Sequence, residues 1–363
     1  MKETLGYFHI IILTYMIQSG VVLFRLPSIL AANFGSNGWV AIPVASVIVI
    51  LNLFLIGLVY TRGKGKSIFD IIEGVVPKAM AYPLYVILAI VWFMLACLVG
   101  KQYVLIFQMI AFPTTHPMIF KLIIDILVFL LVIKGIYNIS KATTVIFYLT
   151  IWMLLSSFYF MREIELARYT SFIFYNSKDL LQGSIDLYTA FLGYELTILL
   201  FPFVSKSSKF IKGIMVGNVV TTIVYLIVCV IAFGFFSYQQ LAEMLFPLLD
   251  LLAYIKLPFI ERIENLLFTF FYLKVLITMV FYTWAAQHSI SRIFKKTKAN
   301  VIALIIIGVG YGIAFLFVTL EEVDNWLSFF ANVETVIAFG LPLLCLLLLG
   351  IKKVRGQSEQ AKS

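Results

Sequence analysis

The amino-acid sequence predicts an all-α membrane protein in which ten transmembrane helices form two inverted halves of five. Three observations carry this prediction: a very apolar composition, ten apolar stretches near spanning length, and a bias of basic residues toward one side. Of the 363 residues, 62% are hydrophobic and 12% are charged, and the mean hydropathy is +1.04. Soluble domains carry about 25% charged residues. A chain this apolar cannot cover a water-facing surface, which excludes soluble enzymes and nucleic-acid-binding proteins.

The ten spans are predicted from length and hydropathy. A transmembrane helix needs about 20 predominantly apolar residues to cross roughly 30 Å of hydrocarbon. Stretches near or above this length are predicted at 8–34, 39–60, 82–112, 119–134, 142–161, 184–204, 211–236, 262–287, 299–320 and 327–350. No linker or low-complexity tract separates them, so residues 1–350 are expected to form one transmembrane domain, followed by a cytoplasmic tail at 351–363.

The basic residues predict the orientation in the membrane. If both termini are cytoplasmic, the inner segments carry roughly three times as many Lys and Arg residues as the outer segments, as the positive-inside rule requires. The same bias accounts for the net charge of +9 without a nucleic-acid partner, because the basic residues lie in separate loops that face lipid headgroups. The first span is too long for the apolar core of a signal peptide and is expected to be retained.

The ten spans divide into an inverted repeat, with one half at about 8–161 and the other at about 184–350. Five is odd, so the second half enters the membrane from the opposite side. Connector lengths support the division: spans 1 and 2 and spans 6 and 7 are joined by short turns, NFGSNG and SKSSKFIK, whereas long segments follow at 61–81 and 237–261. The arrangement predicts a LeuT-like fold with discontinuous helices 1 and 6.

Polar residues beside a glycine mark the expected breaks in these two helices. The first span has Gln18, Ser19 and Gly20 near its middle, and the sixth has Gly193 and Glu195, separated by a tyrosine. Backbone groups released at such breaks form polar sites at mid-membrane. The alternative is that each glycine is a packing notch in a continuous helix. Two glycines at matching positions favour breaks.

The breaks predict the charge of the ligand. Free N–H groups at the positive end of a half-helix suit a carboxylate, and free carbonyl groups near Glu195 suit an ammonium group. An α-amino acid carries both charges, so a zwitterion fits better than a sugar or a lone ion. The alternative for Glu195 is a structural carboxylate held by neighbouring N–H groups. The residues predicted to bind ligand are Ser19, Gly20, Val21, Leu192, Gly193, Tyr194 and Glu195 at the breaks, with Trp92, Ala96 and Thr278 on spans 3 and 8.

The residues on spans 3 and 8 also have a simpler interpretation, since aromatic and small residues at helical spacing are commonly helix packing. Among the charges within spans, Arg25 and Glu334 are predicted to form an outer gate. The alternative is that Arg25 extends to the interface as a topological anchor. Lys101 and Lys274 could neutralise Glu195, replace a coupling cation, or pair with Asp125 in a structural network.

The sequence offers no support for an enzyme, a cofactor or a metal site. His9, His116 and His288 are scattered near span ends, outside any zinc-protease, nucleophile-elbow or phosphate-loop motif. The three cysteines lie inside apolar runs without ligand spacing, which is typical of small core residues.

Three segments resemble the spore germination permease family, the B subunits of GerA-type nutrient germinant receptors, which are related to the amino-acid/polyamine/organocation transporters. They are FLGYELTILLFPF at 191–203, ERIENLLFTFFYLKV at 261–275 and AFPTTHP at 111–117. The segment FRLP at 24–27 is similar to the first span of sodium-coupled amino-acid symporters, whose arginine forms an outer gate with an acid of span 10. The resemblance to the permease family covers the whole chain in length and span layout.

The resemblance implies a receptor that senses a nutrient, commonly an amino acid, in the inner membrane of a dormant spore. It also implies two partners, a larger A subunit and a lipoprotein C subunit, through which ligand binding triggers germination. The alternative is a proton- or cation-coupled amino-acid transporter, because receptors and transporters share the fold and differ in whether binding drives a transport cycle or shifts a population of states. A channel or structural subunit is a third possibility.

Overall fold

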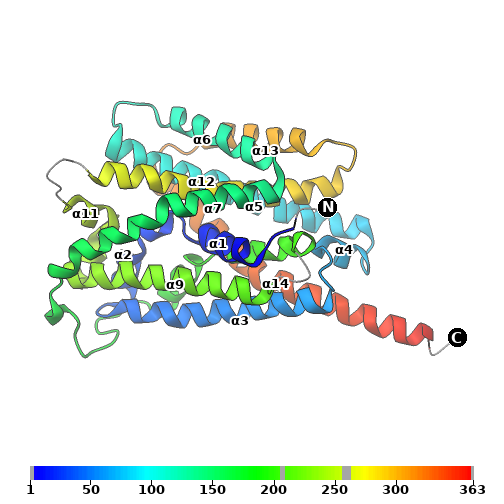
Figure 1. The fold of residues 1–363 in the computed structure, drawn as a ribbon, viewed down its shortest axis with the longest axis horizontal. Helices are drawn as coiled ribbons and strands as arrows, with labels where there is room; N and C mark the ends of the chain where they lie inside the picture. Colours follow the sequence, from blue (N-terminus) through cyan, green and yellow to red (C-terminus); the bar gives the residue numbers. More distant parts are fainter. Residues whose placement is uncertain (1–3, 205–208, 256–262, 361–363) are drawn as a thin grey trace.

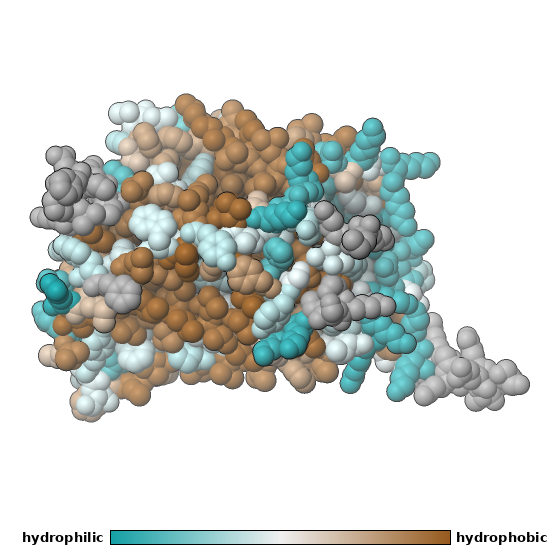
Figure 2. Space-filling view, in the orientation of Figure 1, coloured by the Kyte–Doolittle hydropathy of each residue, from teal (hydrophilic) through white to brown (hydrophobic). Residues whose placement is uncertain are grey.

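The computed structural model describes residues 4–204, 209–255 and 263–360, and these are almost entirely helical. Figure 1 shows the long helices running side by side along the long axis of the molecule, with α6 (Pro117–Val132) and α13 (Ala299–Ala314) at one edge and α3 (Ala41–Arg62) at the other. Figure 2 shows a broad apolar belt across the middle of the visible face and hydrophilic side chains gathered at the end that holds α4 (Ile68–Glu73). This distribution is that of a protein surrounded by lipid.

The first predicted span is interrupted. Helix α1 (Tyr7–Gln18) ends where Gly20 adopts an extended conformation, and the chain resumes as the 3-10 turn η1 (Val21–Phe24) and then α2 (Leu26–Phe34). A proline in the first turn of α2 is favourable there, because the first N–H groups of a helix have no intrahelical partner. The break lies at the predicted glycine.

The sixth predicted span is interrupted in the same way. Helix α8 (Leu180–Thr189) ends before Gly193, whose φ of +112° is a conformation that side-chain-bearing residues rarely adopt. The chain then continues as the 3-10 helix η5 (Tyr194–Phe203). The predicted fold, with discontinuous first and sixth helices, is confirmed.

The remaining spans are continuous helices close to their predicted ranges. They are α3, α5 (Lys78–Ala111), α6, α7 (Gly135–Ile151) with η3 (Trp152–Arg162), α9 (Phe210–Phe235), α12 (Ile263–Ile293), α13 and α14 (Leu320–Gln360). Seven of the described helical segments are long and apolar enough to cross a membrane. The other three predicted spans are the interrupted first span and the 16-residue helices α6 and α13.

Short helices occupy the loops and the two long connectors. The connector at 61–81 contains α4, and the corresponding connector at 237–261 contains α10 (Tyr238–Glu243) and α11 (Pro247–Ala253). The other short elements are η2 (Gly38–Val40) and η4 (Leu166–Arg168). Part of the predicted turn between spans 6 and 7, and the predicted start of span 8 at residue 262, lie outside the described residues.

Helix contacts occur in pairs that exchange the two halves of the chain. The contact between α1 and α7 (spans 1 and 5) is matched by α8 with α14 (spans 6 and 10), and α1 with α9 (spans 1 and 7) is matched by α8 with α3 (spans 6 and 2). The contact of α5 with α14 corresponds to that of α12 with α7, and the extensive contact between α5 and α12 corresponds to itself. This exchange is what an inverted repeat requires.

Several boundaries differ from the prediction: α7 begins seven residues before 142, α12 ends six residues after 287, and α13 ends six residues before 320. Helix α14 begins at Leu320, seven residues before the predicted start of span 10, and it continues through the tail to Gln360, beyond the main bundle in Figure 1. The tail sequence is rich in Lys, Arg, Gln and Glu, which are good helix formers. Hydropathy marks the end of the apolar span, whereas helicity extends past it.

Candidate ligand-binding site

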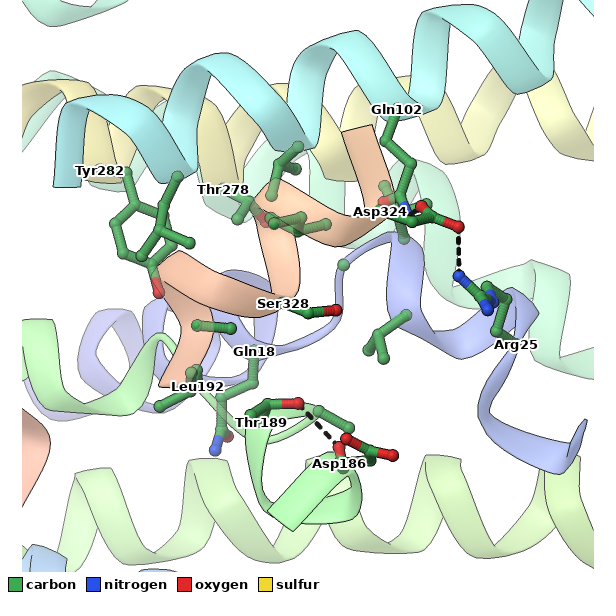
Figure 3. Close-up of a pocket in the computed structure, with 18 of the residues that line it drawn as sticks. Gln18, Arg25, Gln102, Asp186, Thr189, Leu192, Thr278, Tyr282, Asp324 and Ser328 are labelled. Carbon is green, nitrogen blue, oxygen red and sulfur yellow. Dashed lines mark hydrogen bonds and ion pairs between the residues drawn. The ribbon is translucent and has the colours of Figure 1, made fainter. Parts of the chain in front are cut away.

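A cavity of about 230 Å³ lies between the two interrupted helices. Its wall is formed by the break after α1, by η1 and α2, by the end of α8, and by α5, α12 and α14 (Figure 3). Its volume is below the roughly 300–1,000 Å³ of pockets for drug-sized ligands, so it suits a smaller molecule. The polar or charged residues on its wall are Gln18, Arg25, Gln102, Asp186, Thr189, Thr278, Tyr282, Asp324 and Ser328.

Four residues predicted to bind ligand lie on this wall. Gly20 and Val21 come from the first break, Leu192 from the second, and Thr278 from α12. The Thr278 hydroxyl donates to the Ile17 carbonyl oxygen at 3.3 Å, which joins α12 to the last turn of α1. The two breaks and span 8 therefore meet around one cavity.

Ser19, Trp92 and Ala96 were also predicted to contact ligand, but they do not line this cavity. The Ser19 hydroxyl accepts a hydrogen bond from Lys274 Nζ at 2.6 Å. Trp92 Nε1 donates to Glu334 Oε1 at 2.9 Å. Ala96 lines a separate cavity of about 20 Å³ between α5, α6, α12 and α13. All three are buried and join the helices that surround the site.

The residues after the second break lie behind the wall. The Tyr194 hydroxyl accepts from Asn52 Nδ2 at 2.7 Å and also hydrogen-bonds with Tyr188. The Glu195 oxygens accept from the Gly193 N–H at 2.9 and 2.7 Å. This contact occupies a backbone donor released by the break, and it is the geometry of the structural carboxylate that was the alternative for Glu195. Glu195 is linked to the cavity by Tyr282, whose hydroxyl donates to Oε1 at 3.1 Å.

The predicted pairing of Arg25 with Glu334 is wrong. Arg25 forms an ion pair with Asp324, and Gln102 Nε2 donates to the other Asp324 oxygen at 2.6 Å (Figure 3). Glu334 lies ten residues further along α14, about 15 Å at a rise of 1.5 Å per residue, and is fully buried. The predicted spans leave Asp324 in the loop between residues 320 and 327, because hydropathy places the start of span 10 too late.

The buried lysines also have partners that differ from the expected ones. Asp125 pairs with Lys121, whose Nζ lies 2.6 Å from both carboxylate oxygens, so the expectation of a pair with Lys101 or Lys274 is wrong. Lys121 is 1% exposed within α6, inside the predicted span 119–134. Lys274 donates to the Tyr15 and Ser19 hydroxyls beside the first break. A cation at this place is favourable because α1 ends there, where its dipole is negative.

Two side chains tie the breaks to each other. Gln18 Nε2 donates to the Phe191 carbonyl oxygen at 2.9 Å. The Tyr225 hydroxyl on α9 lies within hydrogen-bonding distance of carbonyl oxygens from both breaks, 2.9 Å from Gln18 and 2.7 Å from Ala190. Carbonyl groups that lost their helical partners are therefore satisfied by side chains, as buried backbone groups require.

Other polar groups at the cavity remain free. Among the described residues, no acceptor is recorded for the backbone N–H groups of Val21 and Val22, which line the cavity at the first break. The Asp186 carboxylate receives a hydrogen bond from Gln182 Nε2 at 2.8 Å, and within the described part of the chain no cation lies within ion-pairing distance of it. The residues of the cavity wall thus include two backbone donors without an acceptor and a carboxylate without an ion-pair partner among the described residues.

Sequence reasoning missed Gln102, Asp186, Asp324 and Ser328 as residues of the site. Asp186, Asp324 and Ser328 lie at or just beyond the ends of predicted spans, where polar side chains are ordinary. Gln102 lies inside the predicted span 82–112. Helical phase provides a signal for two of them, because Asp324 and Ser328 are one turn apart and therefore share a face of α14.

Comparison with known proteins places the chain in a family. It matches the family model for spore permeases, described as spore germination protein, over residues 4–323. Curated relatives include the spore germination protein GerQB of Bacillus cereus, 22% identical over 316 residues that cover 87% of this chain and 83% of GerQB. Another is the spore germination protein YndE of Bacillus subtilis strain 168, 21% identical over 302 residues that cover 81% of this chain and 82% of YndE.

Solved structures with a similar fold are transporters. Mhp1, a nucleobase-cation-symport-1 family transporter in a closed conformation, superposes with a TM-score of 0.64 at 13% identity, covering 96% of this chain and 78% of Mhp1. A manganese transporter of Eremococcus coleocola superposes with a TM-score of 0.59 at 13% identity, covering 95% of this chain and 78% of that transporter. At this identity the likeness concerns the fold alone. Because the family model spans most of the chain, the protein belongs to the spore germination permease family.

Proposed function

We propose that this protein is the nutrient-sensing B subunit of a spore germinant receptor and that it binds a small zwitterion, an amino acid, in the cavity between its interrupted helices. That cavity is the observation that carries the proposal. Membership of the germination family and a transporter-like fold support a receptor-like or transporter function. In this proposal the protein lies in the spore inner membrane with both termini cytoplasmic, and partner A and C subunits read out ligand binding.

The polarity of the cavity supports a zwitterion. The unpaired N–H groups of Val21 and Val22 are suited to a carboxylate, because they are donors at the start of a helical segment. The Asp186 carboxylate is suited to an ammonium group. A neutral sugar would leave the Asp186 charge without a partner, which makes it a poorer ligand for this wall.

The test is a binding assay on the purified protein with a panel of single amino acids and, as a neutral comparison, glucose. We expect at least one amino acid to bind, and Asp186→Asn to weaken its binding about tenfold or more, because about 1.4 kcal/mol lost from one charged contact is a factor of ten. The matched control is Asp179→Asn, which changes an exposed acid of the same segment and keeps a side chain able to cap α8. Binding of glucose alone, or equal affinities in the two variants, would contradict the proposal.

The second candidate function is amino-acid transport coupled to protons or cations, which the transporter fold favours. Liposomes that contain only this protein distinguish the two functions. A sensor binds the amino acid without net uptake, whereas a transporter accumulates it inside the liposome. Uptake abolished by Asp186→Asn would assign the same cavity to transport.

A further inference from the structure

Two glutamates from different halves of the chain meet behind the ligand cavity. Glu195 lies at the start of η5 and is 4% exposed, and Glu334 lies within α14 and is 0% exposed. Both carboxyl groups lie next to the Trp92 side chain, and each contributes to the electrostatic environment of the other. Trp92 connects the two, because its indole N–H binds Glu334 while its side chain lines a small space that Glu195 also lines.

The groups around this pair are neutral. Glu195 receives hydrogen bonds from the Gly193 N–H and the Tyr282 hydroxyl, and Glu334 Oε1 receives one from Trp92. Within the described residues, no Lys, Arg or His lies within 4 Å of either carboxyl group. The second oxygen of Glu334 is buried and has no hydrogen-bond partner. A buried carboxyl oxygen without a partner indicates that a proton or an ion binds there.

The titratable groups near the two glutamates add no positive charge. They are phenols on three different elements: Tyr282 on α12, Tyr194 on η5 and Tyr188 on α8. On α3, the Asn52 amide donates to Tyr194 and to the Ala338 carbonyl oxygen. None of these groups carries a positive charge that could compensate for two carboxylates. Two adjacent carboxyl groups without a cation cannot both be ionised in a buried site.

We propose that Glu195 and Glu334 form a proton-binding site in which one proton is shared between the two carboxyl groups. The proton supplies the missing partner of Glu334 and removes the repulsion across the small space that η5 and α14 both line. Tyr282 links the site to the ligand cavity, because its hydroxyl donates to Glu195 while its ring forms part of the cavity wall. Loss of the proton would leave two facing anions and would drive the second half of the broken sixth helix away from the tenth.

Infrared spectroscopy tests this proposal directly, because a protonated carboxylic acid has a carbonyl-stretch band that a carboxylate lacks. The full-length protein is measured in lipid nanodiscs at neutral pH without any nutrient, where exposed carboxyl groups are ionised. We expect an acid band in the wild type, its loss in the double variant Glu195→Gln/Glu334→Gln, and a shift in Tyr282→Phe, which removes one hydrogen bond from the pair. The matched control is Glu321→Gln, an exposed glutamate at the start of the same helix, and it should leave the band unchanged.

Three outcomes would overturn the proposal. The first is the absence of an acid band in the wild type, and the second is a band that survives in the folded double variant. The third is a band that appears in choline chloride and disappears in sodium chloride, which would assign the pair to a monovalent cation. Since no nutrient is present, the result is independent of the proposed function: the proton site can fail while amino-acid binding holds, and the reverse.

Discussion

Gly193 is a residue at which the two interrupted helices lie close together. Its φ of +112° favours glycine, and a Cβ atom added there would lie 2.7 Å from Ile17 Cγ2 and 3.1 Å from the Ile17 backbone carbon and oxygen. A side chain at residue 193 would strain the backbone, because L-residues rarely adopt this φ. It would also clash with Ile17, whose backbone atoms in α1 cannot move aside as the end of a flexible side chain can. Both breaks therefore depend on this residue.

We expect Gly193→Ala to destabilise the protein by about 2 kcal/mol or more, since strained backbone and overpacking each cost roughly 1–3 kcal/mol. The measurement is the thermal unfolding midpoint of the purified protein in detergent. Gly340→Ala is the matched control, because a Cβ there meets no atom within 4 Å. An equal midpoint for both variants would show that the break tolerates a side chain.

At this scale the sequence identified residues more readily than their partners. Gly20, Gly193 and Glu195 could be selected because glycine beside a polar residue is unusual in the middle of an apolar span. The partner of Arg25 could not be selected, because Asp324 and Glu334 lie on one helix and the choice depends on where that helix begins. Pairing depends on depth in the membrane, and hydropathy gives depth only to within a turn or two.

At the scale of the helices, the two breaks are joined by α9 as well as by direct contact. Tyr225 on α9 places one hydroxyl between carbonyl oxygens of Gln18 and Ala190, one from each break. Asn218, also on α9, accepts a hydrogen bond from the Gln18 side chain. The seventh span, α9, therefore holds the ends of α1 and α8 in position relative to each other through these hydrogen bonds.

The Tyr225→Phe substitution removes the hydroxyl and keeps the ring. We expect a loss of about 1–3 kcal/mol of stability, the cost of leaving a buried polar group unsatisfied, and weaker binding of whichever amino acid the wild type binds. Thermal unfolding and the binding assay measure the two effects. Tyr148→Phe provides the control, because that side chain is 60% exposed. Wild-type stability and affinity in Tyr225→Phe would show that this hydroxyl does not hold the two breaks together.

The helices themselves were predictable, since long apolar stretches in a bilayer have few alternatives to helix. Their irregular parts were less so. The continuation of the sixth span as the 3-10 helix η5, and the extension of α14 to Gln360, leave no trace in hydropathy. Backbone geometry at a break is decided by neighbours from distant parts of the chain, such as Ile17 and Tyr225, and a single sequence does not show which neighbours meet.

For the whole molecule, the question is which side of the membrane the cavity faces. Arg25 and Asp324 lie on its wall, and their side chains are 34% and 20% exposed, so their ion pair is within reach of water. A solvent-accessible pair contributes roughly 0–1 kcal/mol to stability. The more important effect of the ion pair is to join Arg25, the residue before α2, to α14 across the cavity. The bias of basic residues predicts that this end of the molecule faces outward.

A cysteine at Ser328, on the cavity wall, tests this orientation. We expect Ser328→Cys to react with a membrane-impermeant thiol reagent added from outside, and Arg25→Ala to increase the labelling rate several-fold by removing the contact across the cavity. Labelling of purified membranes is followed by mass spectrometry. The unsubstituted chain is a suitable background, because Cys97, Cys229 and Cys345 are buried. Labelling only in inside-out vesicles would reverse the predicted topology.

The N-terminal segment gives the fold a mechanical consequence. The Leu5 N–H donates to the Phe203 carbonyl oxygen at 2.8 Å, and Leu5 pairs with Val204 in parallel, so the start of the chain is fastened to the far end of the sixth span. A tilt of η5 would therefore act on Leu5 through a backbone hydrogen bond as well as through packing of its buried side chain. A change at the second break thus has a short route along η5 to the N-terminal segment at Leu5.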